Sequence, residues 1–199
     1  MLLMTQLIET AKVRAPAESF VERVHRMRAC GFGLGFVSLA SVLLQTGAHP
    51  VTWILLAANA FAWPLLARAL TLRSADPAKV ETRNLLIDSA MGGVWIALMQ
   101  FNLLPSVLIA LVLAADKMNF GGWGLLMRGI AVQLAACVLA AALHGLYFAP
   151  QTTMLNILAS LPLLIVYPLV LSVSSYSLAR TIRDQNRKIV ELHHAGLDN

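Results

Sequence analysis

Apolar residues of this chain are gathered into long blocks separated by short polar stretches. Six of these blocks reach or approach the length of a helix that crosses a bilayer, for which roughly 17 to 25 residues are needed. The separators contain Gly, Pro, Asn and His, the residue types expected in turns. The pattern therefore predicts an all-α membrane protein, a bundle of six transmembrane helices. The predicted spans are residues 30–46, 51–69, 85–101, 104–118, 126–145 and 154–176.

The basic residues predict the orientation of this bundle. Lys and Arg lie before the first block, between the second and third, around the turn between the fourth and fifth, and after the sixth; the three opposite loops have none. Because Lys and Arg near helix ends are retained in the cytoplasm, both termini are predicted to be cytoplasmic. The net charge of +5 is then explained by topology, so the lipid bilayer, and not a nucleic acid, is the expected partner.

Composition agrees with this prediction and divides the chain into three regions. Hydrophobic residues make up 58% of the sequence and charged residues 13%, whereas a soluble domain is about one quarter charged. Within residues 1–29, Ser19 and Glu22 have the spacing of a capping box, which predicts a cytoplasmic segment with a helix lying on the inner leaflet. Residues 30–176 form the predicted membrane domain, and residues 177–199 follow it.

The last of these regions is predicted to be a signalling helix, because no helix breaker follows the sixth block until Gly196. Residues at alternating steps of four and three form a heptad seam, with Ile182 and Ile189 at a positions and Leu178 and Leu192 at d positions. These side-chain shapes favour a parallel two-stranded coiled coil and therefore a homodimer. The alternative is a solvated amphipathic helix packed on loops of the same chain. The seam consists of Leu171, Ser175, Leu178, Ile182, Gln185, Ile189 and Leu192.

Two prolines lie inside the sixth block. Pro162 and Pro168 each remove a backbone hydrogen bond and favour a kink. A kinked helix can bend or rotate about the break, so both are hinge candidates. Proline is also tolerated in membrane helices for purely structural reasons.

A polar stripe on the third block is the candidate sensing site. Asn84, Asp88, Trp95 and Asn102 recur at helical spacing on one face. A carboxylate in a membrane is costly, so Asp88 is expected to face the bundle and to have a basic partner. Arg68, Arg83 and Arg128 lie at comparable depth. The stripe is either a static ion pair near the inner surface or part of a site for an unknown small ligand.

Nothing in the sequence indicates catalysis. A nucleophile with an adjacent base, a phosphate-binding loop and a carboxylate pair at a plausible distance are all missing from the sequence. Cys30 and Cys137 lie in different apolar blocks, and His49 and His144 have no third ligand residue beside them. These residues are therefore not expected to form an enzyme, and no metal or cofactor is expected in them.

An ordered set of residues from about 20 to 190 resembles the second membrane-associated sensor domain family. The resemblance begins at Ala60-Phe61-Ala62-Trp63-Pro64 and continues through Asp76-Pro77, Glu81, Asn84-Leu85 and Asp88 to Gly93 and Trp95. Its later part comprises Met99, Asn102, Leu104-Pro105-Ser106, Ser160-Leu161-Pro162, Tyr167-Pro168 and Ser175-Tyr176. The ordered set is more specific than any single motif in it.

This resemblance implies a sensor of the bacterial inner membrane that controls a cytoplasmic cyclase. The family occurs at the N-terminus of GGDEF diguanylate cyclases and of some class III adenylate cyclases. The final residues, 195–199, look like the entry to a GGDEF domain, so the chain is expected to stop at a domain boundary. The missing domain would use GTP and Mg²⁺ to make cyclic di-GMP.

Three alternatives remain open from the residues. The output is an adenylate cyclase; or the bundle is a small transporter or channel, with Trp63-Pro64 and Tyr167-Pro168 as helix breaks; or the bundle anchors and dimerises an enzyme without sensing. The stimulus and the sign of regulation are not given by the sequence.

Overall fold

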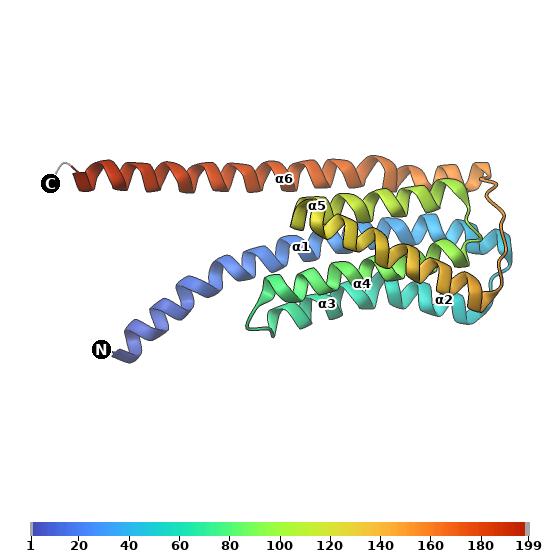
Figure 1. Ribbon diagram of the computed structural model, residues 1–199, viewed down its shortest axis with the longest axis horizontal. Coiled ribbons are helices and arrows are strands. Elements are labelled where there is room, and N and C mark those ends of the chain that lie inside the picture. Colours follow the sequence, from blue (N-terminus) through green and yellow to red (C-terminus); the bar gives the residue numbers. More distant parts are fainter. Residues whose placement is uncertain (1, 198–199) are drawn as a thin grey trace. The chain divides into compact units, whose positions relative to one another are not determined.

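The chain folds into helices joined by short loops. The computed structural model describes the backbone of residues 2–197 and the side chains of residues 21–176, 179, 180 and 183. No strand occurs in the described backbone, so the predicted all-α class is confirmed (Figure 1). The helices are α1 Leu2–Thr46, α2 Pro50–Ala57, the π-helix η1 Ala58–Ala62, α3 Trp63–Leu72, α4 Pro77–Leu98, α5 Leu103–His144 and α6 Met154–Leu197.

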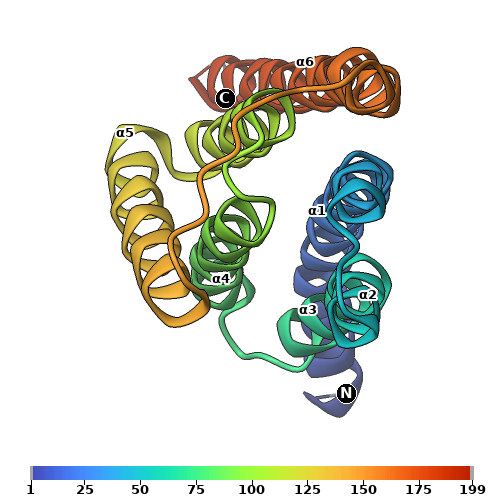
Figure 2. The ribbon, with the colours of Figure 1, turned by 90° about the vertical axis from the view of Figure 1, so that its right-hand side faces the viewer.

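The chain divides into two compact units, Met1–Tyr167 and Pro168–Asn199. In the first unit, α1 packs beside α2, η1 and α3, while α4 packs most extensively on α5 (Figure 2). The second unit holds the C-terminal part of α6, which is one continuous helix from Met154 to Leu197.

Helix α5 reverses direction at Gly122, as Figure 1 shows. Gly122 has φ 61° and ψ −155°, a conformation that glycine adopts without a Cβ clash. Residues 103–121 and 123–144 therefore form two arms of α5, where the sequence predicted two spans joined by a glycine turn. The second arm lies very close to α4, because a Cβ atom built on Gly93 would lie 2.1 Å from the carbonyl oxygen of Gln133.

Four helical segments among the described residues are long and apolar enough to cross a membrane. Helix α4 is not among them, since its first half carries charged residues such as Lys79 and Glu81. The two arms of α5 count there as one segment. Six transmembrane helices therefore stay a prediction. The four segments are Val21–Thr46, Pro50–Leu72, Leu103–His144 and Met154–Tyr176.

The N-terminal region differs from the prediction. Helix α1 is continuous from Leu2, so no separate helix ends before residue 30 and the capping box does not start a helix. The apolar segment begins at Val21. The physical reason is that Arg28 is buried and ion-paired inside the bundle, so its charge does not mark a water-exposed end. Contact of residues 1–29 with the inner leaflet stays a prediction.

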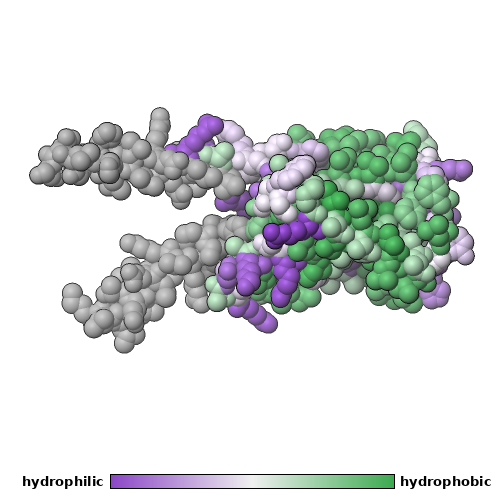
Figure 3. Space-filling view, viewed as in Figure 1, coloured by the Kyte–Doolittle hydropathy of each residue, from purple (hydrophilic) through white to green (hydrophobic). Residues whose placement is uncertain are grey.

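The outer surface of the first unit is strongly apolar. Figure 3 shows a broad hydrophobic surface bordered by hydrophilic patches. Large side chains such as Leu143, Val138 and Phe61 are 80%, 68% and 57% exposed. Contiguous apolar surface of this extent marks contact with a membrane or another protein. It agrees with the membrane association that the sequence predicts.

Candidate functional site: a buried charge cluster and the cavity beside it

Arg28 is the centre of a buried charge cluster that joins α1 to α4. Its Nε donates to Oδ2 of Asp88 at 3.0 Å, and its Nη2 donates to Oε1 of Glu81. The three residues are 5%, 2% and 2% exposed. A buried charge is tolerated when it is paired and hydrogen-bonded, and this arginine meets both conditions. Breaking the cluster would leave an uncompensated charge in the bundle.

Helix α3 completes the hydrogen bonding of both carboxylates. Trp63 donates from its indole Nε1 to Oδ1 of Asp88 at 2.6 Å, and Thr71 donates to Oε2 of Glu81 at 3.1 Å. Asn84 donates to Thr71 at 3.1 Å and to the carbonyl of Ala67 at 3.3 Å. The cluster therefore ties three helices together at one end of the bundle.

A π-helical turn directly precedes Trp63. In η1, the N–H of Trp63 bonds to the carbonyl of Ala58, five residues back, and the following Pro64 has no N–H to donate. The extra residue in this turn shifts the helix face on which the next side chains lie. Trp63 reaches Asp88 from this position, while Asn59 inside the turn faces the interior. Such π turns are frequent at functional sites.

A second group of polar residues lies on the first arm of α5. The hydroxyl of Tyr167 on α6 donates to Oδ1 of Asp116, and Nζ of Lys117 donates to the carbonyl of Leu113 at 2.9 Å. Lys117 is 1% exposed and forms no ion pair within 4.0 Å with any described residue. A Cβ atom on Gly129 would lie 2.3 Å from its Cδ, so the absence of a side chain there makes room for the lysine stem.

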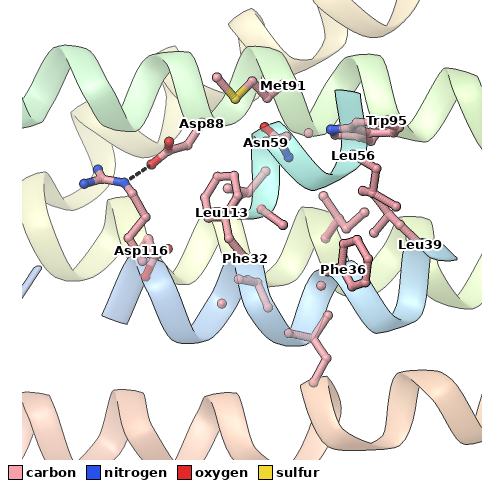
Figure 4. A pocket seen from close by; sticks show the side chains of 18 residues that line it. Phe32, Phe36, Leu39, Leu56, Asn59, Asp88, Met91, Trp95, Leu113 and Asp116 are labelled. Carbon is pink, nitrogen blue, oxygen red and sulfur yellow. Dashed lines mark hydrogen bonds and ion pairs between the residues drawn. The ribbon is translucent and has the colours of Figure 1, made fainter. Parts of the chain in front are cut away.

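A cavity of about 60 Å³ opens between these two groups (Figure 4). Its polar end is formed by Arg28, Asp88 and Asp116, and its remaining walls are mainly apolar and aromatic. A mostly apolar cavity with a few convergent polar groups is the usual form of a small-molecule site. The apolar walls include Phe32, Phe36, Leu39, Leu56, Met91, Trp95, Leu113 and Leu163.

Asn59 lines this cavity from η1. Its Oδ1 is buried and has no hydrogen-bond partner among the described residues. A buried amide oxygen without a partner carries a desolvation cost of about 1–3 kcal/mol. This atom is therefore available to a molecule that occupies the cavity.

A ladder of polar side chains joins α1 to the first part of α6. Ser38 bonds to Ser160 at 2.7 Å, and Ser41 donates to Asn156 at 3.1 Å. Gln45, one turn further along α1, bonds to Asn156 at 2.9 Å, and to Thr153 at 2.6 Å. All of these residues belong to the first unit. The ladder fixes the register of α6 against α1, in the half of α6 that also carries Tyr167.

The four residues of the predicted stripe are all buried, but they divide between three environments. Asp88 and Trp95 line the cavity. Asn84 belongs to the charge cluster, whereas Asn102 lies between α4 and α5 and bonds to the carbonyl of Gln151 at 2.7 Å. The stripe is therefore only partly one site. A sensing role for these residues stays a prediction.

The basic residues considered as partners of Asp88 from the sequence were the wrong ones. The structure pairs it with Arg28, whereas Arg68 bonds to Glu22 at 3.1 Å, and Arg83 and Arg128 are exposed. The physical reason is the continuous α1, which brings Arg28 into the bundle beside α4. The predicted depth of a residue in the membrane does not show which helix lies beside α4.

Sequence reasoning also missed Glu81, Asp116 and Lys117. The last two fall inside the predicted span 104–118, and charges within an apolar span are the signal that could have found them. Glu81 lay in a stretch predicted to be a polar loop. It is buried because Arg28 and Thr71 both bond to it.

The predicted hinge and seam lie on α6. Pro162 and Pro168 are within the continuous helix, and Pro168 is the first residue of the second unit. Of the seam, Leu171 is half-buried and Ser175 exposed. The helix continues to Leu197, but the remaining seam side chains lie outside the described ones. These are Leu178, Ile182, Gln185, Ile189 and Leu192.

No metal site is found: the described residues contain no group of three or more His, Cys, Asp or Glu side chains that could hold a metal ion. Cys30 and Cys137 are both free thiols.

Comparison with known proteins agrees with the resemblance seen in the sequence. The MASE2 domain model matches residues 23–111. The probable diguanylate cyclase DgcC of Escherichia coli K12 is 30% identical over 170 residues, as is its counterpart in E. coli O6:H1. The match covers 85% of this chain and 46% of each relative, so the chain spans about half the length of these relatives. No solved structure matches the chain. The expected resemblance is confirmed: residues 23–111 match the MASE2 domain, a membrane-associated sensor domain.

Proposed function

We propose that this chain is the membrane sensor and dimerisation module of a diguanylate cyclase, which makes cyclic di-GMP from two GTP molecules with Mg²⁺. The proposal is supported by the MASE2 match and by relatives described as probable diguanylate cyclases. The match covers 46% of these relatives, which leaves room outside it for a catalytic domain, and we place that domain after α6.

We further propose six transmembrane helices in the bacterial inner membrane, with both termini in the cytoplasm. The apolar segment Leu103–His144 would supply two spans, one for each arm of α5, and helix α4 would supply one more. The buried charges of α4 do not oppose this topology, because Glu81 and Asp88 are paired with Arg28 inside the bundle. The basic loops would then all face the cytoplasm.

One observation carries the sensor function: the cavity reaches the part of α6 that belongs to the first unit. Leu163 of α6 lines the cavity, and Tyr167 of α6 bonds to Asp116, which also lines it. Interfaces in packed bundles switch between discrete arrangements and do not deform smoothly. A molecule that enters the cavity would therefore change how the start of α6 is held.

The output would travel along α6 to a coiled coil. The heptad seam from Leu171 to Leu192 supports a parallel homodimer in which the cyclase domains face each other. Two GTP-loaded subunits must meet for cyclic di-GMP to form. Rotation or bending of α6 near Pro162 or Pro168 would change that encounter.

A chimera tests this proposal. Residues 2–197 replace the matching region of the E. coli cyclase relative, and cyclic di-GMP formed from GTP and Mg²⁺ is measured in membrane vesicles. We expect Trp95→Ala and Asp88→Asn to change the output at equal protein abundance. Leu143→Ala, at an 80% exposed position, is the control and should leave it unchanged. Equal output from all four proteins would reduce the bundle to an anchor.

An adenylate cyclase output is tested separately. The complete gene product is assayed for cyclic di-GMP from GTP and for cyclic AMP from ATP. If only cyclic AMP is formed, the output domain is an adenylate cyclase and not a diguanylate cyclase. The proposed sensor function is not affected by that result.

A small transporter or channel is the second candidate, supported by buried charges on three helices. Arg28 on α1, Asp88 on α4 and Lys117 on α5 are each at most 5% exposed. Ionisable residues inside a membrane bundle often mark ion or substrate pathways. Solute uptake by purified protein in liposomes, lost in Asp88→Asn, would favour transport over sensing.

A further inference from the structure

We propose that the cavity binds a small protonated amine, with its ammonium group between Asp116 and Asn59. This inference deepens the proposed sensor function by naming the ligand class. Both residues line the cavity from different elements, α5 and η1, as Figure 4 shows. Three properties of the cavity support a cation that carries N–H donors: its charge, its free acceptors and its walls.

The charge balance of the site favours a cation. Glu81, Asp88 and Asp116 supply three carboxylates, whereas Arg28 and Lys117 supply two cations. Asp116 interacts electrostatically with Asp88, Lys117 and Arg28, so these groups act on one another. One negative charge is left over when all are ionised. Burial without compensation is costly for a carboxylate, and a bound cation removes that cost.

Two of the described side chains that line the cavity carry an acceptor oxygen without a donor. Asp88 uses both oxygens, one for Arg28 and one for Trp63. Asp116 uses Oδ1 for Tyr167, and its Oδ2 has no partner among the described residues. Oδ1 of Asn59 is buried and equally unpartnered. Two acceptors without donors match an ammonium group, which has three or more N–H donors and no acceptor.

The volume of the cavity limits the size of the ligand, and its aromatic walls favour a positively charged one. A cavity of about 150 Å³ holds benzene, so one of about 60 Å³ has room for roughly two or three non-hydrogen atoms. Phe32 and Trp95 supply aromatic rings, which attract cations. Methylammonium and ethylammonium fit this description.

Other ligand classes fit less well. Calcium takes six to eight oxygen ligands and magnesium six, whereas this cavity offers two free ones from Asp116 and Asn59 among the described residues. An anion would meet an excess of negative charge, and the guanidinium of Arg28 is already shared by two carboxylates. The geometry therefore favours a donor-rich cation over a metal ion or an anion.

Binding is tested with methylammonium chloride on the 199-residue chain in lipid nanodiscs. We expect a saturable rise in melting temperature above that produced by sodium chloride at equal ionic strength, because a ligand of the folded state stabilises it by mass action. Tetramethylammonium, which has no N–H donor and is too large, should behave as sodium does. Equal effects of all three salts would overturn the proposal.

Two variants locate the site. Asp116→Asn keeps the acceptor for Tyr167 but removes the charge, and Asn59→Ala removes the second acceptor. A hydrogen bond to a charged group is worth about 1.5–3 kcal/mol, so each should weaken methylammonium binding by roughly tenfold or more. Asp76→Asn is the matched control, since Asp76 is exposed and Asn caps a helix equally well.

The melting temperature without ligand separates binding from a structural role. Because Asp116 is a half-buried carboxylate without a cation of its own among the described residues, we expect Asp116→Asn to be as stable as the natural chain or more so. A protein that melts lower without ligand, yet keeps its response to methylammonium, would overturn the assignment of Asp116. Because cyclase output is not measured, failure of amine binding does not decide the sensor proposal, and loss of cyclase control does not decide amine binding.

Discussion

Nε of Arg28 on α1 lies 3.0 Å from Oδ2 of Asp88 on α4, and both residues are at most 5% exposed. The two residues are 60 positions apart in the chain, and their pairing joins α1 to α4. Glu81 and Trp63 complete its hydrogen bonds from α4 and α3. The same pair closes the polar end of the cavity. It therefore links the stability of the bundle to the shape of the site.

Replacing Arg28 by Met should destabilise the chain strongly. Two buried carboxylates lose their cation, and breaking a buried pair in this way costs about 3–5 kcal/mol. Denaturant unfolding in detergent micelles measures the change. Arg68→Met is the control. Arg68 pairs with Glu22, and the two side chains are 41% and 46% exposed, so the loss of this pair should cost at most about 1 kcal/mol. Equal losses in both variants would contradict the role given to Arg28.

Gly93→Ala should separate α4 from the second arm of α5. The new Cβ would lie 2.1 Å from the carbonyl oxygen of Gln133, which is backbone and cannot rotate away. Overpacking of this kind costs about 1–3 kcal/mol. Gly33→Ala on α1 is the matched control, because nothing lies within 4 Å of its Cβ, and alanine there favours the helix by up to about 1 kcal/mol. The melting temperatures of the two variants should move in opposite directions.

Asn156→Ala should loosen α6 from α1. Asn156 is fully buried and bonds to Ser41 and Gln45. Its loss leaves buried partners unsatisfied, at a cost of about 1–3 kcal/mol. A double-mutant cycle with Ser41→Ala should give a coupling of about 0.6 kcal/mol, the average for hydrogen bonds between membrane helices. Additive single effects would show that the two residues do not interact.

Ile182→Asp should prevent dimerisation through α6. An aspartate at an a position places a charge in the seam of the predicted coiled coil. Sedimentation in detergent should then report a monomer, and cyclic di-GMP synthesis by the chimera should fall. Arg180→Asp also introduces an acidic residue but lies off the seam at an exposed position, so dimers should persist. A dimer that survives Ile182→Asp would place the contact elsewhere in the chain.

Local pattern was sufficient for much of the fold. The first apolar block ends at Thr46 and the sixth begins at Met154, and α1 ends and α6 begins at these same residues. The glycines near Gly122 separate two further blocks, and α5 is interrupted there. Block length and turn chemistry act over a few residues, so they are visible in one sequence. The burial of Asp88 also followed from the cost of a carboxylate among apolar residues.

The sequence by itself determined that the chain is helical, rich in apolar segments and related to membrane-associated sensors. Only the tertiary structure decided that Arg28 pairs with Asp88, that Asn59 and Asp116 line the same cavity and that Ser38 meets Ser160. These contacts join residues far apart in the chain, and their partners depend on which helices become neighbours. Helix neighbours are chosen by packing over whole faces, through close approaches such as that of Gly93 to Gln133, and spacing within one helix does not encode that choice.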